Sequence, residues 1–577
     1  MLSCDCNGSY PSAQRLVDNK VASRVHAKEG GLYNFTEGMP EAAGSFMGWA
    51  TLASQPPVSI EAIKAFAKQV RAEGYTSCLL IAQGGSSQAP MTITKYNKGD
   101  RYHFKFHVLD NVSPVRMHAL THNLNFEKTL VLVSSKSGGT IEVRSNLSIV
   151  YRLFTEALGE DAPQHFVAIT DPGTQLETRA LDEGWRAVFS GEPTVGGRFS
   201  ALSVFCLVPA ALIGLDLDQV IEKARAAEAV CSADSLDNPA IGLASFMYDS
   251  MLEGRDKFSL ITPKRARTFG LWIEQLVAES VGKNGKGILP NIEFDPLVLS
   301  VDHGDRTVIP YLVETPLDDE RENFQRGLGR IDPAYPRRTY EVTDVTDLFA
   351  HFVMWEYATA MVGWLMELNP FDQPDVALPK AATLDILKSG MPQPNFTETF
   401  LGGIDLGKVE VTCSPAVAAD NLHDALYNLF ASIKPGDYFA FDAFVPFTGD
   451  NRREALEGIR HLVASELNTV SCLELGPRYL HSTGQLQKGG TNNGVFLVVS
   501  TGEIDDIPLE GLEAASLGEL AKAQAAGDTS ILIDRGRRVV HLHLPDNAGI
   551  TLRLLEKAVT DIVFELKSGI RTGIWNA

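Results

Sequence analysis

The stretch that decides the fold reads TLVLVSSKSGGT and occupies residues 129–140. Its first five residues are apolar or β-branched, which predicts a buried strand at residues 129–133. Hydroxyl residues and glycines follow, and a helical pattern then runs to about Leu158. Strand, glycine-rich loop and helix in this order are typical of one unit of a parallel, doubly wound α/β sheet.

The same succession recurs on both sides of this stretch. A helix with Ser59 as its N-cap ends at Gly74, and a buried strand at residues 77–82 then leads into QGGSS. The pattern predicts further strands at residues 166–170, 258–262, 308–313, 438–445, 494–499 and 538–542. It predicts further helices at residues 268–280, 349–368, 454–467 and 517–526.

These elements predict an α/β protein with several packed units. A chain of 577 residues has room for about three or four of them. We expect two doubly wound domains and an additional C-terminal α/β region. The predicted divisions are an N-terminal segment and three larger parts, at residues 1–58, 59–235, 236–390 and 391–577.

The composition restricts the classes of partner. Hydrophobic residues are 44% and charged residues 21%, as in folded globular proteins. The chain has 51 Lys and Arg against 72 Asp and Glu, a net charge of −21. Such a surface repels nucleic acid and anionic membranes, so we expect neither as a partner. An anionic substrate would need a local concentration of cations and hydrogen-bond donors.

The cysteines and the first residues bear on the compartment. The seven cysteines are an odd number and stand mostly in apolar strings, which predicts buried free thiols in a reducing compartment. No apolar signal region opens the chain, and residues 200–215 contain Pro209 and are too short to span a bilayer. We expect a core helix there and a cytoplasmic protein. Cys4 and Cys6 lack a second cysteine pair, so we expect no metal site.

The loop at residues 135–140 is the first candidate site. It combines three hydroxyls, Lys136 and two glycines between a strand and a helix. Backbone N–H groups, hydroxyls and a helix N-terminus together form a phosphate cradle, although an ordinary turn between strand and helix has the same composition. The order of a Walker loop is missing. The glycine-rich loop at residues 83–87 follows another strand and strengthens the first interpretation.

A second group of residues carries charge and amide groups. Arg198 stands among glycines in VGGRFS, where the alternative is a salt-bridge anchor. Gln275 and Glu279 are four residues apart and therefore share a helix face. Glu279 lies near the helix end, where the helix dipole disfavours a carboxylate, although a solvated surface glutamate is the common case. Gln373 and Lys380 follow the long apolar helix, and a surface lysine is the alternative for Lys380.

Five separated motifs give the chain its resemblance to a known family. Over most of residues 60–380 it resembles glucose-6-phosphate isomerases, which implies that the two doubly wound domains are sugar isomerase (SIS) domains. The motifs occupy residues 84–86, 135–140, 196–200, 275–283 and 371–380. Two further stretches resemble the isomerase half of bacterial transaldolase–isomerase fusion proteins, namely GKNGKGILP at residues 282–290 and GPRYLHSTGQ at residues 476–485. No array of strands and helices long enough for a transaldolase barrel precedes residue 60.

The resemblance implies a role for each matching residue. It assigns the substrate phosphate to Ser135, Lys136, Ser137 and Thr140, and sugar contacts to Gly85, Ser86, Gln275 and Gln373. Glu279 matches the base that moves a proton between C2 and C1, and Arg198 matches the cation that stabilises the enediolate. Lys380 matches a lysine that assists ring opening. This chemistry needs a desolvated carboxylate and a fixed positive charge, but no metal or cofactor.

Several histidines are candidates for the ring-opening step. The family places it between the base and the lysine, an interval in which this sequence has His303 in a predicted turn and His351 in an apolar helix. His481 matches the fusion proteins but follows the lysine. The pair His541 and His543 has no third ligand nearby and is interpreted as one face of a strand.

The resemblance implies interconversion of glucose 6-phosphate and fructose 6-phosphate in glycolysis and gluconeogenesis. Three alternatives remain, namely a dual phosphoglucose and phosphomannose isomerase, a non-catalytic sugar-phosphate-binding protein, and a subunit that partners a separate transaldolase. The joint presence of Glu279, Arg198 and Lys380 argues against a non-catalytic protein. A homodimer is expected, because in the family the histidine comes from the neighbouring subunit.

Overall fold

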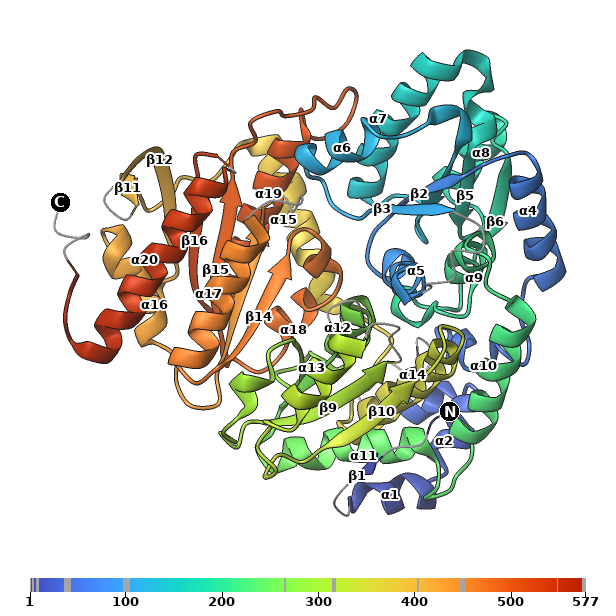
Figure 1. Cartoon of the computed structure of the whole chain (residues 1–577), viewed down its shortest axis with the longest axis horizontal. Helices are drawn as coiled ribbons and strands as arrows, with labels where there is room; N and C mark the ends of the chain where they lie inside the picture. Colours follow the sequence, from blue (N-terminus) through green and yellow to red (C-terminus); the bar gives the residue numbers. More distant parts are fainter. Residues whose placement is uncertain are drawn as a thin grey trace. The chain divides into compact units, whose positions relative to one another are not determined.

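The computed structural model describes residues 2, 5–6, 10–35, 43–96, 104–263, 266–313, 318–401, 404–445, 452–546 and 548–572. The chain divides into two compact units. The first contains Met1–Asp110 and Leu124–Gln373, and the second contains Asn111–Asn123 and Pro374–Ala577. Each unit has its own hydrophobic core. Figure 1 labels the helices and strands along the chain.

The first unit contains two parallel sheets with the same winding order. The first sheet has the order β3-β2-β4-β5-β6, with β2 (Ser77–Ala82), β3 (Lys105–Leu109), β4 (Thr129–Ser134), β5 (Phe166–Thr170) and β6 (Ala187–Ser190). The second has the order β1-β10-β9-β7-β8, with β7 (Lys257–Ile261), β8 (Leu289–Glu293), β9 (Arg306–Val313), β10 (Arg338–Val342) and the short antiparallel edge strand β1 (Asp5–Cys6). The parallel strands are hydrogen-bonded in register throughout.

The winding order predicts where each sheet binds ligands. In the first sheet the chain runs from β2 to β3 on one side and then crosses to β4 on the other, so its direction switches between β2 and β4. Open α/β sheets bind ligands outside the carboxyl ends of the strands at such a switch point. The two loops that begin there are the two glycine-rich loops singled out from the sequence.

The second unit contains one mixed sheet with the order β11-β12-β16-β15-β13-β14. Its strands are β11 (Phe396–Leu401), β12 (Ile404–Cys413), β13 (Tyr438–Phe444), β14 (Val470–Leu475), β15 (Gly494–Thr501) and β16 (Arg538–Leu544). The last four are parallel and repeat the winding order of the other two sheets, with the switch between β13 and β15. The hairpin of β11 and β12 extends this sheet in the antiparallel sense.

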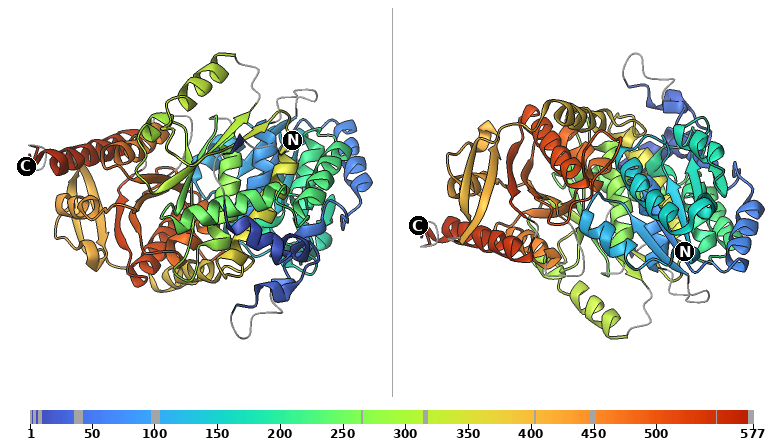
Figure 2. Two further views of the ribbon diagram at one scale, coloured as in Figure 1. Left: turned by 90° about the horizontal axis from the view of Figure 1, so that it is seen from below. Right: turned by 90° about the horizontal axis from the view of Figure 1, so that it is seen from above.

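Helices cover the sheets of both units. Those of the first unit are α1 (Ser12–Asp18), α2 (Val21–His26), α4 (Ile60–Ala72), α5 (Gly85–Tyr96), α7 (Ile141–Leu158), α8 (Gln175–Asp182), α9 (Val204–Leu212), α10 (Leu217–Cys231), α11 (Pro239–Leu252), α12 (Arg267–Val281), α13 (Asp318–Leu328) and α14 (Asp347–Leu365). Those of the second unit are α6 (Pro114–Thr121), α15 (Ala377–Ser389), α16 (Leu422–Ala431), α17 (Arg452–Glu466), α18 (Gly484–Gly489), α19 (Leu517–Asp534) and α20 (Gly549–Ser568). Figure 2 shows α13, in yellow-green, projecting from the rest of its unit.

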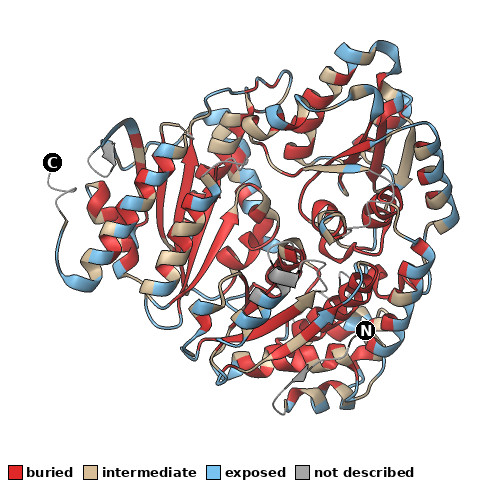
Figure 3. Cartoon of the chain, in the orientation of Figure 1, coloured by how far each residue is buried: buried red, intermediate tan, exposed pale blue. Residues whose placement is uncertain are grey.

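Burial explains why the strands read as continuous apolar runs. The central strands β2, β4, β13 and β15 are buried along their whole length and appear red in Figure 3. Parallel sheets covered by helices on both faces require such strands, since neither face meets water. Helix α14 is apolar on nearly every side because it too lies inside the first unit.

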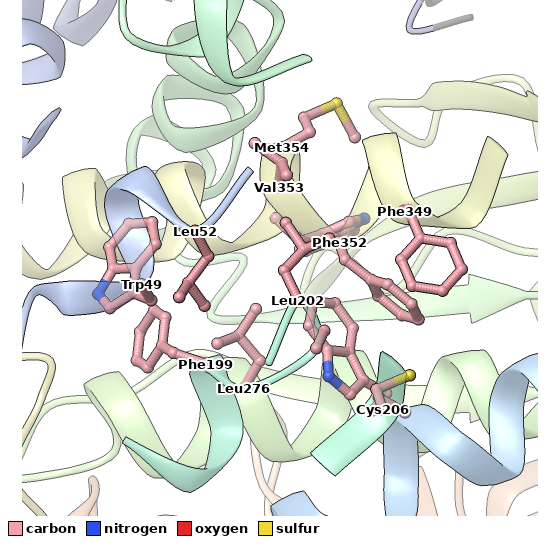
Figure 4. Close-up of a cluster of buried hydrophobic side chains, with 14 of the residues drawn as sticks. Trp49, Leu52, Phe199, Leu202, Cys206, Leu276, Phe349, Phe352, Val353 and Met354 are labelled. Atoms are coloured by element: carbon pink, nitrogen blue, oxygen red, sulfur yellow. The ribbon is translucent and has the colours of Figure 1, made fainter. Parts of the chain in front are cut away.

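An aromatic and aliphatic cluster supports the elements that carry the candidate site. Figure 4 shows Trp49, Phe199, Leu276 and Phe352 within this cluster. Trp49 stacks on Phe199 with ring centroids 4.9 Å apart. Phe199 directly follows Arg198 and Leu276 lies on α12, so the cluster fixes the backbone on both sides of the site.

Several sequence predictions about the fold are confirmed. The Ser59 side chain caps α4 by accepting from the backbone N–H of Ala62 at 3.2 Å. The apolar run at residues 200–215 contains the fully buried helix α9. Cys78, Cys206, Cys231, Cys413 and Cys472 are free and buried, whereas Cys4 lies outside the described residues. None of the described helices is long and apolar enough to cross a membrane.

Candidate active site

The loop after β4 gathers the hydroxyls predicted to hold phosphate. Ser135 and Thr140 approach each other, with 3.2 Å between their hydroxyl oxygens, and the backbone N–H of Ser135 donates to Ile169 of β5. Gly138 has a positive φ of 66°, and a Cβ there would lie 2.8 Å from the Cβ of Thr174. Only glycine fits this position, so the close turn of the loop depends on it.

The same loop opens onto the N-terminus of an 18-residue helix. Thr140 is the N-cap of α7, yet its side chain accepts no capping hydrogen bond from the helix. The first N–H groups of a helix and its dipole attract anions. The side chain of Ser137 is exposed and accepts from the backbone N–H of Gly139 at 3.4 Å. The loop therefore combines hydroxyls with a helix N-terminus, as a phosphate cradle requires.

Lys136 of this loop has a partner that the sequence did not reveal. Its ammonium group forms an ion pair with Asp171 and donates to the carbonyl of Pro193 at 3.3 Å. Burial raises the pKa of the Asp171 carboxyl, and Lys136 acts against that shift. Asp171 follows β5, the strand next to β4, and only the register of the sheet places the two side chains together.

The loop after β2 lies against the loop that carries Arg198. A Cβ added to Gly85 would lie 2.1 Å from the carbonyl oxygen of Gly197 and 2.9 Å from the backbone nitrogen of Arg198. Ser86 is buried in the first turn of α5, and α5 packs on α12. The close approach at Gly85 thus connects the first sheet to the charged residues of α12.

Arg198 is held in one position by groups from two segments, the end of α12 and residues 369–373. It lies in the 3-10 turn Gly197–Phe199 and is 3% exposed. Its Nε donates to the hydroxyl of Ser280 at 2.7 Å, one Nη donates to the carbonyl of Pro370 at 2.6 Å, and the other donates to the side-chain oxygen of Gln373 at 2.9 Å. Burial lowers the pKa of the guanidinium, whereas the charges of Glu279 and Asp372 raise it.

Glu279 lies in the last turn of α12, beside this arginine. Its Oε1 is 3.4 Å from an Nη of Arg198, and its Oε2 accepts from the amide of Gln275 at 3.2 Å. This contact confirms that Gln275 and Glu279 share a helix face. Glu279 is 7% exposed, so its carboxylate is largely withdrawn from water. A desolvated carboxylate beside a fixed cation suits proton abstraction next to a carbonyl group.

The loop at residues 369–373 completes the cluster. The ammonium group of Lys283 donates to the carbonyl of Asn369 at 2.9 Å and to the Oδ1 of Asp372 at 2.6 Å. The carbonyl of Asp372 accepts both from Lys283, at 2.5 Å, and from Arg198, at 3.1 Å. Gln373 closes the loop against Arg198.

The sequence interpretation assigned no role to Ser280, Lys283 or Asp372. Lys283 did carry a usable signal, because it follows Glu279 by four residues at the end of the same helix. Ser280 is adjacent to Glu279 and had only that adjacency to mark it. Asp372 carried no such signal in the sequence, because its role depends on how the chain after α14 returns to α12.

The remaining predicted residues belong to other elements. Lys380 is exposed on α15 and His481 is half-buried in the 3-10 turn Arg478–His481, both in the second unit. Their assignment to the active site stays a prediction. His303 is exposed in the turn before β9, and His351 is buried in α14 with its Nδ1 3.3 Å from the hydroxyl of Tyr311.

His541 and His543 do lie on one face of a strand, as predicted. Both project from β16, and the Ser500 hydroxyl is 2.9 Å from a ring nitrogen of each. Burial lowers the pKa of His541 to about 3 and that of His543 to about 4, so both rings are neutral near pH 7. Within the part of the chain that the structure describes, no group of three His, Cys, Asp or Glu residues is arranged to hold a metal.

Known proteins resemble the chain over the segment that builds this site. The family model of phosphoglucose isomerase matches residues 58–293. A probable glucose-6-phosphate isomerase from Methanococcus maripaludis is 29% identical over 348 residues, which cover 53% of this chain and 77% of that protein. The glucose-6-phosphate isomerase of Citrifermentans bemidjiense is 34% identical over 260 residues, which cover 42% of this chain and 49% of that protein. The chain thus spans about half the length of this second relative.

Solved structures share the fold. A hypothetical protein from Thermus thermophilus matches with a TM-score of 0.56 and 25% identity, covering 66% of this chain and 97% of that one. A glucose-6-phosphate isomerase from Chlamydia trachomatis matches with a TM-score of 0.52 and 17% identity, covering 66% of this chain and 85% of that one. The α/β fold with parallel sheets agrees with both. Over residues 58–293, therefore, the chain is similar to the phosphoglucose isomerase family.

Proposed function

We propose that the chain interconverts glucose 6-phosphate and fructose 6-phosphate by proton transfer through an enediolate. The observation that carries the proposal is the buried pair of Glu279 and Arg198, whose charged groups are 3.4 Å apart. The pair supplies both requirements of an aldose–ketose isomerase, a base for the proton next to the carbonyl and a cation for the charge that develops on oxygen.

In the proposed reaction the substrate binds in its open-chain form. The loop at residues 135–140 holds the phosphate, and Gly85, Ser86, Gln275 and Gln373 line the sugar. Glu279 removes the proton from C2, and the electron pair forms the double bond between C1 and C2. The carbonyl oxygen on C1 takes up the negative charge, and Glu279 returns the proton to C1 while the hydroxyl proton moves from O2 to O1. No atom is gained or lost.

Arg198 acts by being in place before the charge develops. Its contacts with Ser280 and Pro370 fix the guanidinium, so little reorganisation is needed during the reaction. The hydrogen bond from Gln275 orients the Glu279 carboxylate at the same time. A preorganised cation of this kind stabilises an enediolate more than a mobile one would.

The proposal extends to partners and location. It includes a homodimer in the cytoplasm, in glycolysis and gluconeogenesis, with Lys380 and a histidine assisting ring opening. The free buried cysteines support a reducing compartment, and the net charge of −21 argues against nucleic acid or membrane partners. Light scattering during size-exclusion chromatography tests the dimer, and co-purification from cell extract tests association with a separate transaldolase.

A coupled assay on the purified chain tests the activity. Glucose 6-phosphate should be converted to fructose 6-phosphate and the reverse, with EDTA present, and the variant Glu279→Gln serves as the matched blank. Turnover of mannose 6-phosphate by the same preparation would extend the proposal to a dual isomerase. Absence of turnover with both glucose 6-phosphate and fructose 6-phosphate would overturn it.

A further inference from the structure

We propose that Lys283 is a positioning residue which, together with Arg198, clamps the loop at residues 369–373 onto the end of α12 and so places Gln373 in the active site. The proposal rests on the proposed function and deepens it. The clamp has a direct geometric basis, since both cations donate to the same carbonyl oxygen, that of Asp372.

Among the described residues, the side-chain hydrogen bonds of Lys283 go to this loop. Its three hydrogen bonds go to the carbonyls of Asn369 and Asp372 and to the Asp372 carboxylate. The ammonium group is 2% exposed, so no substrate reaches it directly. A role in the reaction must therefore act through the groups that Lys283 holds.

The polar end of the loop is held in place by these hydrogen bonds. Phe371 anchors the middle of the loop in the hydrophobic core, where it packs edge-on against Tyr33 at 5.2 Å. Asp372 and Gln373 lie beyond this anchor, and Gln373 is exposed. The side-chain oxygen of Gln373 accepts from Arg198, which leaves its amide N–H₂ group to donate to a sugar hydroxyl. Without the clamp, this amide would lose its fixed direction.

Burial of two neighbouring cations costs free energy of folding, which indicates that Lys283 has a role other than stabilising the fold. Burial and the charge of Arg198 lower the pKa of Lys283 to about 8, against the charges of Asp372 and Glu279. These three residues are the charged groups that face the ammonium group from its surroundings. Because the charged form of Lys283 is disfavoured in the folded protein, its retention fits a positioning role better than a stabilising one.

The clamp makes the position of the loop depend on pH. Below about pH 8 Lys283 is protonated and all three of its hydrogen bonds form. Above that pH the neutral amine loses the ion pair with Asp372 and cannot donate all three bonds as a cation does. The catalytic efficiency should therefore fall on the alkaline side with an apparent pKa near 8.

Lys283→Met tests the clamp, and Lys286→Met is its matched control. Lys286 lies in the same turn and is exposed, and its side chain donates to a backbone carbonyl outside the loop, that of Met366 at 2.7 Å. Lys283→Met should lower kcat/KM by about tenfold or more, whereas Lys286→Met should stay within about twofold. Lys283→Arg should restore part of the efficiency and remove the alkaline limb, because arginine stays protonated.

Hydrogen exchange of residues 369–373, corrected for the intrinsic pH dependence, separates this proposal from the proposed function. Faster exchange in Lys283→Met than in Lys286→Met supports the clamp even if the wild type converts no sugar phosphate, in which case only the proposed function fails. Equal exchange and equal kcat/KM in the two variants would overturn the clamp. If Lys283→Met does not fold, Lys283→Arg carries the test. An unchanged alkaline limb in that variant would overturn the proposal, and loss of the limb would support it.

Discussion

The parallel strands of the two units share one winding order, but the units contain very different polar clusters. The cluster at α12 combines Arg198 and Lys283 with Glu279 and the partly exposed Asp372. In the second unit the cluster contains Asp442, Glu474 and Asp528 with Lys488, all 3% exposed or less. Cations and carboxylates are balanced in the first cluster, whereas carboxyl groups outnumber the lysine in the second.

The second cluster is paired internally and closed. Lys488 of α18 forms an ion pair with Asp528 of α19 at 2.6 Å, and the hydroxyl of Tyr479 donates to the same carboxylate at 2.8 Å. The Asp442 carboxyl accepts from the amide of Gln487 at 3.0 Å. The helices α18 and α19 are thereby joined by buried polar contacts.

The balance of charge decides what such carboxyl groups can do. Asp442 lies opposite Glu474 in the register of β13 and β14. Burial, together with the charges of Asp528 and Glu474, raises the pKa of Asp442 well above its ordinary value, and burial raises the pKa of Glu474 to about 7. Burial and like charges thus disfavour the ionised form of the carboxyl groups in the second cluster, whereas Glu279 has the cation Arg198 beside it.

Replacement of the base should have the largest effect. Glu279→Gln keeps the shape of the side chain and one acceptor oxygen but removes its basicity. We expect kcat to fall by about 10²–10⁴-fold with little change in KM, as for other general bases. Steady-state kinetics measure this, and the midpoint of urea unfolding confirms that the fold is intact. Near-normal turnover would remove Glu279 from the mechanism.

Breaking the closed cluster should cost stability. Lys488→Met leaves the buried carboxylate of Asp528 without its cation, and we expect the free energy of unfolding to fall by about 3–5 kcal/mol. Urea denaturation of the full chain measures the loss. The double variant Lys488→Met with Asp528→Leu removes both charges and should recover most of it. A single variant as stable as the wild type would show that the pair is unimportant.

Loss of the loop lysine should weaken phosphate binding. Lys136→Met removes one charge-assisted donor from the loop after β4, and we expect KM to rise by about tenfold with a smaller change in kcat. Asp171→Asn is the companion variant, because it frees Lys136 from its ion pair and should not raise KM. Inorganic phosphate should compete with substrate in the wild type. An unchanged KM in Lys136→Met would place the phosphate elsewhere.

The histidine assignment can be sharpened with an open-chain substrate. If His481 opens the ring, His481→Ala should slow cyclic glucose 6-phosphate several-fold, roughly as loss of one proton-transfer group does, and spare a four-carbon aldose phosphate. His303→Ala is the parallel variant for the alternative assignment. Equal slowing of both substrates by His481→Ala would exclude a ring-opening role for this residue.

The smallest effect concerns pH and the second cluster. Glu474 titrates near 4.3 when unfolded and at about 7 when folded. Protonated Glu474 therefore favours the folded state fully below about pH 4, and this contribution to the free energy of unfolding is lost as the pH rises through 7. The free energy of opening of the β14 amides, measured by hydrogen exchange, should fall from pH 5 to 8. The expected slope is less than about 1.4 kcal/mol per pH unit. Glu474→Gln should flatten this decline, and an identical slope in the variant would contradict the shift.

The sequence alone predicted the central strands, the two glycine-rich loops and half of the charged site. Strands β2 and β5 begin and end where the sequence placed them, because an apolar run between turn residues has few alternatives. Gln275 and Glu279 were predicted to meet because four residues return a helix to the same face. The strands at or next to the sheet edges were missed, because they carry a weaker apolar pattern; they are β1, β3, β6, β8, β10, β11, β12 and β14.

Only the tertiary structure decided the partners that lie far apart in the chain. Arg198 contacts Glu279, which lies 81 residues further along the chain, and Lys136 pairs with Asp171, which follows the neighbouring strand. Lys283 reaches the loop at residues 369–373 because α14 returns the chain to the end of α12. Local patterns depend on helix and strand periods, whereas these contacts depend on strand order and on how the helices pack, which no short window of sequence contains.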